Sequence, residues 1–199
     1  MRKITAIKAQ KKTNERVNIY LDDQFAFGLA VEAAAGLQVG QILDEESVVA
    51  LQDEDLFFRA KWAAQHLLSY RPRSVAEVRR SLRRKDYPAE TIERVITHLE
   101  AVKLLDDRAF SAYWIEHRET FKPRSRLALR QELTQKGVSR PVIEDMLAGV
   151  DDEALARRAA TKRAYRWAGL SRDEYVQKMG GYLQRRGFQY ETVRLVVAE

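Results

Sequence analysis

The feature of this sequence that most constrains its fold is an internal repeat with a period of about fifty residues. Three stretches align without gaps, 51 and then 50 residues apart. They are SVAEVRRSLRRKDYPAETIERVI (74–96), SRLALRQELTQKGVSRPVIEDML (125–147) and YVQKMGGYLQRRGFQYETVRLVV (175–197). Apolar residues recur at matching positions, such as Val78, Leu129 and Met179. Such a repeat predicts a row of similar units, each packed on the next, rather than one large core.

Each unit contains three segments whose apolar residues recur at helical spacing. The first segments all begin with acidic residues: DEDLFFRAKWAAQHLL, DDRAFSAYWIEHRETF and DDEALARRAATKRAYRWA. Acidic groups at a helix start favour the helix because they complement its dipole. We therefore expect nine helices between Asp53 and Glu199, arranged as three tandem three-helix repeats in an elongated, curved array.

A basic turn joins the first and second helices in two of the units. It reads YRPRS at 70–74 and FKPRS at 121–125. Proline ends the first helix and moves the residue before it out of the α region. Ser74 and Ser125 are then expected to cap the next helix. The third unit has GLSRDEY (169–175) instead, which predicts Ser171 as the cap of a longer second helix.

The first thirty residues differ from the rest because apolar and polar residues alternate. Antiparallel strands are predicted at 2–11, 15–22 and 24–28, followed by a brief helix within 29–37 and a loop at 39–47. The expected fold is therefore mainly α, with a small antiparallel β-rich N-terminal segment before the repeats. The expected boundaries are 1–46 for that segment and 47–105, 106–150 and 151–199 for the repeats.

Positive charge concentrates on the second helices, while the third helices are acidic. The 35 Lys and Arg residues therefore give a net charge of only +6 against 29 Asp and Glu. A polyanion or an acidic protein surface is the expected partner, although solvated helix faces are the alternative. The candidate contact residues are Arg71, Arg73, Arg79, Arg80, Arg83, Arg84 and Lys85; Arg118, Lys122, Arg124, Arg126 and Arg130; and Arg157, Arg158, Lys162, Arg163, Arg185 and Arg186.

Signals for catalysis or metal binding are weak. There is no cysteine, which excludes disulfides and thiolate metal sites, and the three histidines lie on different predicted helices without a partner at ligand spacing. The Asp pairs at 106–107 and 151–152 fit helix caps better than metal sites. Trp62, Tyr113, Trp114 and Trp167 are expected in the core or between repeats. We expect no enzymatic activity, no cofactor and no metal.

No apolar run reaches the length of a signal peptide or a membrane span, so a cytoplasmic protein without membrane contact is expected. The combination of features resembles the RecX family, which regulates the RecA recombinase. The likeness is carried by residues 69–118, with the proline-arginine turn, the basic second helix and LLDDRAFSAYW, and by residues 122–147. Residues 4–29 are similar to the N-terminal extension of the longer members. The third repeat departs most from the family pattern.

The resemblance implies a protein, expected to be a monomer, that docks onto the RecA filament on single-stranded DNA. It also implies that the protein inhibits the filament and so modulates homologous recombination, DNA repair and the SOS response. Two other interpretations stay open from the sequence. One is a sequence-specific regulator that reads DNA through helix-turn-helix units. The other is a helical scaffold for an unrelated protein.

Overall fold

The computed structural model describes residues 1–10 and 13–198, except for the side chains of residues 13 and 14. The N-terminal segment forms a four-stranded antiparallel sheet in the order β3-β2-β1-β4. Its strands are β1 (Arg2–Gln10), β2 (Thr13–Leu21), β3 (Gln24–Ala30) and β4 (Ile42–Leu43). The predicted antiparallel segment is thus confirmed. The end of the strand predicted at 2–11 lies outside the described residues, as does Glu199.

One part of the N-terminal prediction is wrong. The segment 39–47 was expected to be a loop, but β4 within it pairs with β1, Arg2 opposite Leu43 and Lys3 opposite Ile42. Two residues are too few to show an alternating pattern, so the sequence carries no signal for this strand. The strands predicted at 15–22 and 24–28 are joined by a tight turn, in which Asp22 and Asp23 both have the positive φ of a two-residue hairpin turn.

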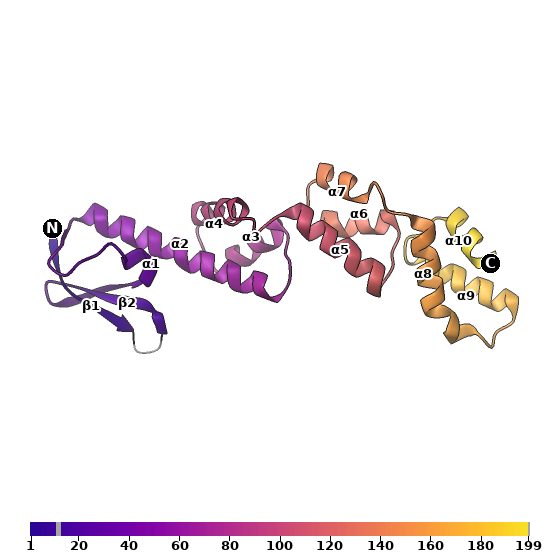
Figure 1. The fold of residues 1–199 in the computed structure, drawn as a ribbon, viewed down its shortest axis with the longest axis horizontal. Coiled ribbons are helices and arrows are strands. Elements are labelled where there is room, and N and C mark those ends of the chain that lie inside the picture. The colour runs from indigo at the N-terminus through magenta and orange to yellow at the C-terminus, as the bar shows by residue number, and fades with distance from the viewer. Residues whose placement is uncertain (11–12, 199) are drawn as a thin grey trace. The chain divides into compact units, whose positions relative to one another are not determined.

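The rest of the chain is helical, and its three-helix repeats are confirmed (Figure 1). A short helix, α1 (Val31–Ala34), precedes them. The helices of the repeats are α2 (Glu45–Tyr70), α3 (Val75–Arg83), α4 (Ala89–Ala101), α5 (Asp107–Phe121), α6 (Arg126–Gln135), α7 (Arg140–Leu147), α8 (Asp152–Ala164), α9 (Arg172–Gln184) and α10 (Tyr190–Ala198), with a 3-10 turn at Tyr165–Trp167. Helix α9 is longer than α3 and α6 and begins with a capping box of Ser171 and Glu174, as predicted.

The chain forms two compact units, Met1–Arg71 with Val78–Val102, and Pro72–Glu77 with Lys103–Glu199. In the first unit, the long helix α2 joins the sheet to the first repeat. Asp55 of α2 is 6% exposed, and it accepts hydrogen bonds from the Arg16 guanidinium at 3.0 and 3.2 Å and from the Ala30 amide at 2.7 Å. A buried carboxylate is tolerated here because strands β2 and β3 supply its donors.

In the second unit, the second and third repeats share one apolar core. Its side chains come from all six helices, with Phe110, Leu133, Leu155 and Met179 among the most deeply buried. They lie at helical spacing along each segment, so each helix contributes a stripe to the same core. The repeat pattern therefore predicts which positions are buried in this unit.

Hydrogen bonds connect each basic turn to the following repeat, and we call this set of contacts the joint. In the second unit, the Ser74 hydroxyl donates to the Lys136 carbonyl at 2.6 Å, and the Val75 amide donates to the Asp107 carboxylate at 2.9 Å. Gly137, with a φ of +80°, packs against Ala76 so closely that a Cβ on it would lie 2.4 Å from the Ala76 Cβ. Only glycine fits this position without displacement.

The joint recurs one repeat later with equivalent residues. The Ser125 amide donates to the Arg186 carbonyl at 3.1 Å, and the Arg126 amide donates to Asp152 at 2.5 Å. Gly187 takes the place of Gly137, again with positive φ. The joint also accounts for both acidic pairs. Their first members, Asp106 and Asp151, cap their own helices, while their second members bind the first amide of the preceding repeat's second helix.

Candidate nucleic-acid interface

The strongest concentration of positive charge lies at the C-terminal end of α3. Val78 and Leu82 form the buried stripe of this helix, and the cations lie away from it, as predicted. Four of them are exposed and form no ion pair with any described residue: Arg80, Arg83, Arg84 and Lys85. We call these four residues the α3 basic cluster. Exposed guanidinium and ammonium groups that form no ion pair are available for contacts with phosphates or carboxylates.

Arg79 is on the same helix but is held by a partner. Its guanidinium forms two hydrogen bonds with Glu93 of α4, at 2.7 and 2.8 Å. The same bridge recurs 51 residues later between Arg130 of α6 and Glu144 of α7, at 2.8 Å. These hydrogen bonds lower the pKa of Glu93 and the pKa of Glu144, because each favours the charged carboxylate. Both arginines thus link the second helix of a repeat to its third.

Glu132 of α6 binds two of the candidate cations in the second repeat. Its carboxylate lies 2.7 Å from the Arg118 guanidinium and 3.0 Å from that of Arg124. The Trp114 indole also donates to it at 2.8 Å, and Arg118 lies over the Trp114 ring. The equivalent of Arg124 in the preceding turn, Arg73, is half-buried and lies 4.0 Å from Glu77. These cations are part of a packed polar network rather than a free surface.

Some of the remaining candidate cations contact other residues, and others are exposed to solvent. Arg157 pairs with Glu153, Arg158 lies 3.7 Å from Glu119, and the Lys162 ammonium donates to the Thr120 carbonyl. Arg163 and Arg186 both lie over the Tyr182 ring, and Arg186 also donates to the Pro123 carbonyl. Arg71 and Arg126 are half-buried, whereas Lys122 and Arg185 are exposed.

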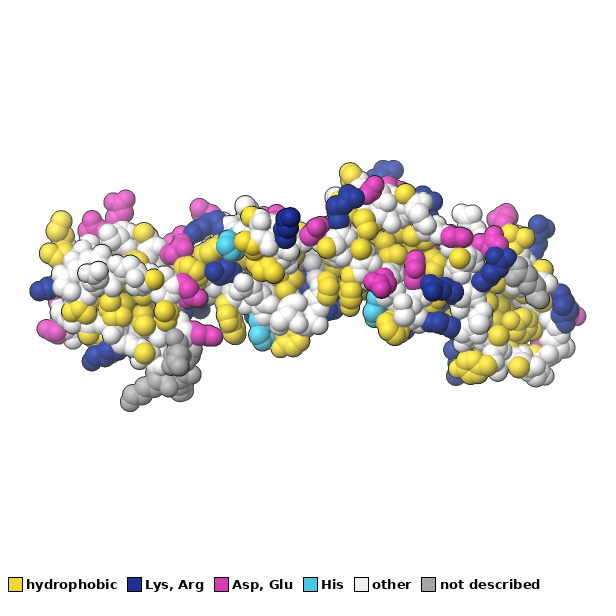
Figure 2. Space-filling model, viewed as in Figure 1, with side chains coloured by type: hydrophobic (Ala, Val, Ile, Leu, Met, Phe, Trp, Pro, Cys, Tyr) yellow, Lys and Arg dark blue, Asp and Glu magenta, His cyan; other side chains and the backbone are white. Residues whose placement is uncertain are grey.

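A second basic surface lies where α5 meets α8 in the second unit. It consists of Lys122, Arg158, Lys162 and Arg166, all exposed, and we call it the α5–α8 basic cluster. The contacts of Lys162 with Thr120 and of Arg158 with Glu119 place these cations at the C-terminal end of α5. Figure 2 shows basic side chains gathered over this part of the second unit.

The sequence analysis missed an exposed set of rings on α2. Trp62 was expected in the core, but 55% of it is exposed, so that prediction is wrong. Its ring stacks on His66 with centroids 5.3 Å apart, and His66 in turn contacts the edge of Tyr70 at 5.1 Å. Residues four apart on a helix lie one above the other. We call these three residues the α2 ladder.

Helix α5 carries a second ladder at the same positions of the repeat. Tyr113, His117 and Phe121 follow each other with centroids 6.0 and 4.9 Å apart, each 51 residues after its counterpart in α2. Figure 2 shows histidine side chains bordered by exposed hydrophobic ones. Trp114 and Trp167, in contrast, pack against the core of the second unit, as expected. The 51-residue spacing of the two histidines was the signal that could have revealed the ladders.

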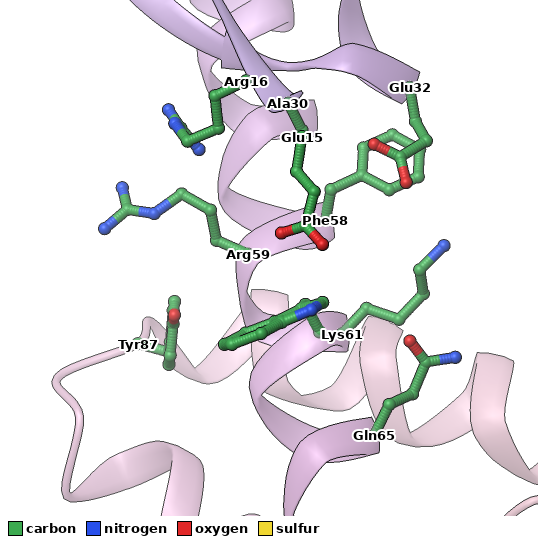
Figure 3. A pocket seen from close by; sticks show the side chains of 10 residues that line it. Glu15, Arg16, Ala30, Glu32, Phe58, Arg59, Lys61, Gln65 and Tyr87 are labelled. Carbon is green, nitrogen blue, oxygen red and sulfur yellow. The ribbon is translucent and has the colours of Figure 1, made fainter. Parts of the chain in front are cut away.

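The α2 ladder borders a cavity of about 650 Å³ in the first unit. Its wall includes Trp62 and Phe58, together with Arg59 and Lys61 from α2 and Arg16 from β2. Figure 3 shows the Arg16 and Arg59 side chains on one side of this space. Two carboxylates, Glu15 and Glu32, also line it. The cavity thus offers an aromatic face beside groups of both charges.

Other classes of site find no support in the part of the chain that is described. Among those residues, no group of three or more His, Asp or Glu side chains is arranged to hold a metal ion. Within the same residues, no helix combines the length and apolar character needed to cross a bilayer. The basic clusters and the ladders are therefore the surfaces to be explained.

Comparison with known proteins decides the family. The chain matches the model of the regulatory protein RecX N-terminal domain at residues 2–44. It also matches the models of the first, second and third three-helix domains of RecX, at residues 60–99, 106–147 and 151–197. It is 39% identical over 208 residues to a protein of Halalkalibacterium halodurans named regulatory protein RecX, covering 98% of this chain and 77% of that protein. The chain belongs to the RecX family.

Other RecX proteins align over nearly the whole chain. A regulatory protein RecX from Bacillus pumilus is 34% identical over 98% of this chain and 76% of its own length. A crystal structure of regulatory protein RecX superposes with a TM-score of 0.78 at 28% identity, covering both chains completely. RecX from Lactobacillus salivarius, at 23% identity and a TM-score of 0.63, shares the fold over 73% of this chain and 96% of its own.

Proposed function

We propose that this chain is a non-enzymatic regulator of the RecA recombinase. In this proposal it binds the filament that RecA forms on single-stranded DNA, limits strand exchange, and so restrains homologous recombination, DNA repair and the SOS response. It acts in the cytoplasm, as a monomer and without a cofactor. The segments 47–105, 106–150 and 151–199 each contribute contacts to the filament. Membership of the RecX family supports the choice of partner.

The observation that carries this proposal is the α3 basic cluster. Its four cations are exposed and form no ion pair with any described residue, whereas Glu93 pairs with Arg79 on the same helix. Arginine suits phosphate and carboxylate partners because its planar fork can form two parallel hydrogen bonds. A filament of protein and DNA presents both kinds of anion. The cluster is therefore the primary contact, and Lys122 belongs to a second one.

The paired arginines have a different role in this proposal. Arg79 and Arg130 bridge the second and third helices of their repeats, so they hold the helix that carries the contact residues. Replacing them removes an exposed bridge, and such bridges contribute about 1 kcal/mol or less. Their loss would weaken filament binding much less than loss of the α3 basic cluster.

The test compares two variants with equal charge. The first changes Arg80, Arg83 and Arg84 to alanine. The control changes Lys103, Lys178 and Arg194, which are exposed cations outside the candidate set, to alanine. Inhibition of RecA ATP hydrolysis and of strand exchange is measured for both. We expect the first variant to lose inhibition while the control retains it. Equal inhibition by the two variants would contradict the assignment.

A selection of duplexes from a random pool separates this proposal from sequence-specific regulation. The proposed contacts go to phosphates and protein carboxylates, which carry no base sequence. We expect no enriched sequence after selection. Strong enrichment of one sequence would instead support a helix-turn-helix regulator.

A further inference from the structure

The α2 ladder is exposed along its length, and the α5 ladder runs from the half-buried Tyr113 and His117 to the exposed Phe121. In α2 the buried alanines are Ala60, Ala63 and Ala64, and the ladder begins at Trp62, two residues after Ala60 and two before Ala64. Two residues correspond to about 200° around a helix, so the Trp62 ring lies on the face opposite Ala60 and Ala64. Tyr70 is 70% exposed and Phe121 is 64% exposed. Large aromatic side chains contribute to stability through burial, so these rings contribute little to it.

Cations lie next to the α5 ladder. Lys122 directly follows Phe121, is exposed, and forms no ion pair within the described part of the chain. The Lys162 ammonium donates to the carbonyl of Thr120, one residue before Phe121. Arg158 lies 3.7 Å from Glu119 at the same end of α5. The rings are thus bordered by the α5–α8 basic cluster.

The third repeat carries cations where the ladders carry rings. Counted from the start of the first helix, the buried Phe110, Ser111 and Ile115 correspond to Leu155, Ala156 and Ala160, each 45 residues later. On the same count, the three ladder positions of α5 correspond to Arg158, Lys162 and Arg166. The same outer face therefore changes from aromatic to basic between the second and the third repeat.

We propose that the α2 and α5 ladders are stacking sites for the unpaired bases of single-stranded nucleic acid, whose phosphates lie on the neighbouring cations. Every base has a π face, and an exposed ring can stack on it regardless of sequence. Bases of a duplex are already stacked on each other, so only a single strand offers free faces. An apolar peptide would also cover the rings, but it would leave the adjacent ammonium groups without partners.

The cavity beside the α2 ladder fits this ligand. Trp62 and Phe58 give it an aromatic wall, and the Lys61 ammonium lies 4.4 Å from the centroid of the Phe58 ring. Arg59 lines the same cavity and is largely exposed, 3.9 Å from the Asp55 carboxylate. A base stacked on Trp62 would place its phosphate within reach of these two cations. Glu15 and Glu32 also line the cavity, with the Glu15 carboxylate between the Arg59 and Lys61 side chains (Figure 3), and they would disfavour a phosphate directly beside them.

This inference rests on the proposed function, because it names the chemistry by which single-stranded DNA is held. Its test must therefore separate stacking from regulation of RecA. The probes are fluorescent oligothymidylate and an abasic strand of the same length, which has the phosphates but no bases. Binding to both is measured by anisotropy at fixed salt, in the absence of RecA. Inhibition of RecA ATP hydrolysis is measured separately.

Two variants test the two proposed kinds of contact, stacking on a ring and the contact of a cation with phosphate. Phe121→Ala should weaken binding of oligothymidylate about tenfold while leaving the abasic strand unaffected, because one stacking contact is lost. Lys122→Ala should weaken both strands equally, since it removes a phosphate contact. Tyr190→Ala is the matched control, as Tyr190 is 65% exposed but lies outside both ladders. We expect it to bind like the unchanged protein.

The α2 ladder has its own fluorescent reporter in Trp62. Oligothymidylate should quench tryptophan emission, the abasic strand should not, and Trp62→Phe should abolish most of the quenching. The inference is overturned if Phe121→Ala binds oligothymidylate normally, or if Trp62 emission does not respond. It is also overturned if ladder variants lose affinity for RecA free of DNA, which would mark a protein-docking face. In each of these cases, intact inhibition of RecA by the unchanged protein would leave the proposed function standing.

Discussion

The backbone amide of Val75 donates a hydrogen bond to the Asp107 carboxylate, at 2.9 Å. The bond joins residues 32 positions apart in the sequence and recurs between Arg126 and Asp152. A part-buried amide at a helix start thus finds its acceptor in the next repeat instead of in its own helix. In the second unit, helix caps thus connect the repeats in addition to the shared apolar core.

The first prediction concerns this joint. Asp152→Ala removes the acceptor of the Arg126 amide, and Ser125→Ala removes the side chain that caps the amide of Ala128. Loss of a cap costs about 1 kcal/mol, so each variant should lower the free energy of unfolding by roughly that amount. Urea unfolding followed by circular dichroism measures it. Because both residues belong to one joint, the double variant should lose less than the sum. Strict additivity would show that the two contacts are independent.

A second prediction concerns Gly137. Gly137→Ala forces a residue with a side chain to keep a φ of +80° and brings its Cβ against Ala76. We expect the free energy of unfolding to fall by about 2 kcal/mol. Gly149→Ala is the control, since Gly149 has no positive φ and no atom within 4 Å of an added Cβ. A control variant as unstable as Gly137→Ala would refute this account of the joint.

A third prediction concerns the attachment of the sheet to α2. Asp55→Ala leaves the Ala30 amide without its acceptor and the Arg16 guanidinium without its carboxylate, with only the Gly28 carbonyl remaining. We expect a loss of about 3 kcal/mol, because a partly buried charge and an amide become unpaired. Asp53→Ala on the same helix breaks an exposed pair with Arg94 and should cost much less. Similar losses for the two variants would mean that Asp55 does not anchor the sheet.

A fourth prediction uses the pKa of Glu93, which Arg79 lowers from the ordinary value of 4.5. A carboxyl whose pKa is lower in the folded chain stabilises the fold above the unfolded pKa, and this contribution disappears as the pH falls through the folded pKa. NMR titration should therefore give Glu93 a pKa below that of an unpaired glutamate. Arg79→Ala should return it towards 4.5, whereas Arg80→Ala should not move it. If the pKa of Glu93 is the same in Arg79→Ala as in the unchanged protein, the bridge does not form in solution.

Much of the architecture follows from the sequence because repetition reinforces weak local signals. The apolar stripes of α3 and α6, the serine caps and the acidic starts of α5 and α8 recur at matching positions, so each unit supports the interpretation of the next. The first repeat departs from this pattern, because α2 begins at Glu45 and the acidic residues from Asp53 that were expected to start it lie within the helix. Strand β4 was missed because two residues are too few to show the alternation of apolar and polar residues that predicts a strand. The joint could be predicted only in part, since Ser74 and Asp107 each look like local caps although both also bind residues of another repeat.

The candidate site was less predictable than the fold. Composition identifies arginines but does not show which of them face a carboxylate. Several arginines that were candidate contact residues form ion pairs instead, with Glu93, Glu132 and Glu144. Trp62 was placed in the core because large rings usually are, yet the adjacent Ala63 and Ala64 take the buried positions. If the buried face of the helix had been assigned from the alanines, Trp62 would have been predicted to face solvent.

The measurement that tests the central claim most directly is the salt dependence of binding to the RecA filament on single-stranded DNA. For the unchanged protein we predict a steep linear fall of log K with log salt, since exposed cations displace counterions from phosphates. Changing Arg80, Arg83 and Arg84 to alanine should reduce the slope by about 2, given about 0.7 for each lost contact with a single strand. An unchanged slope in that variant would contradict the assignment of the α3 basic cluster as the contact surface.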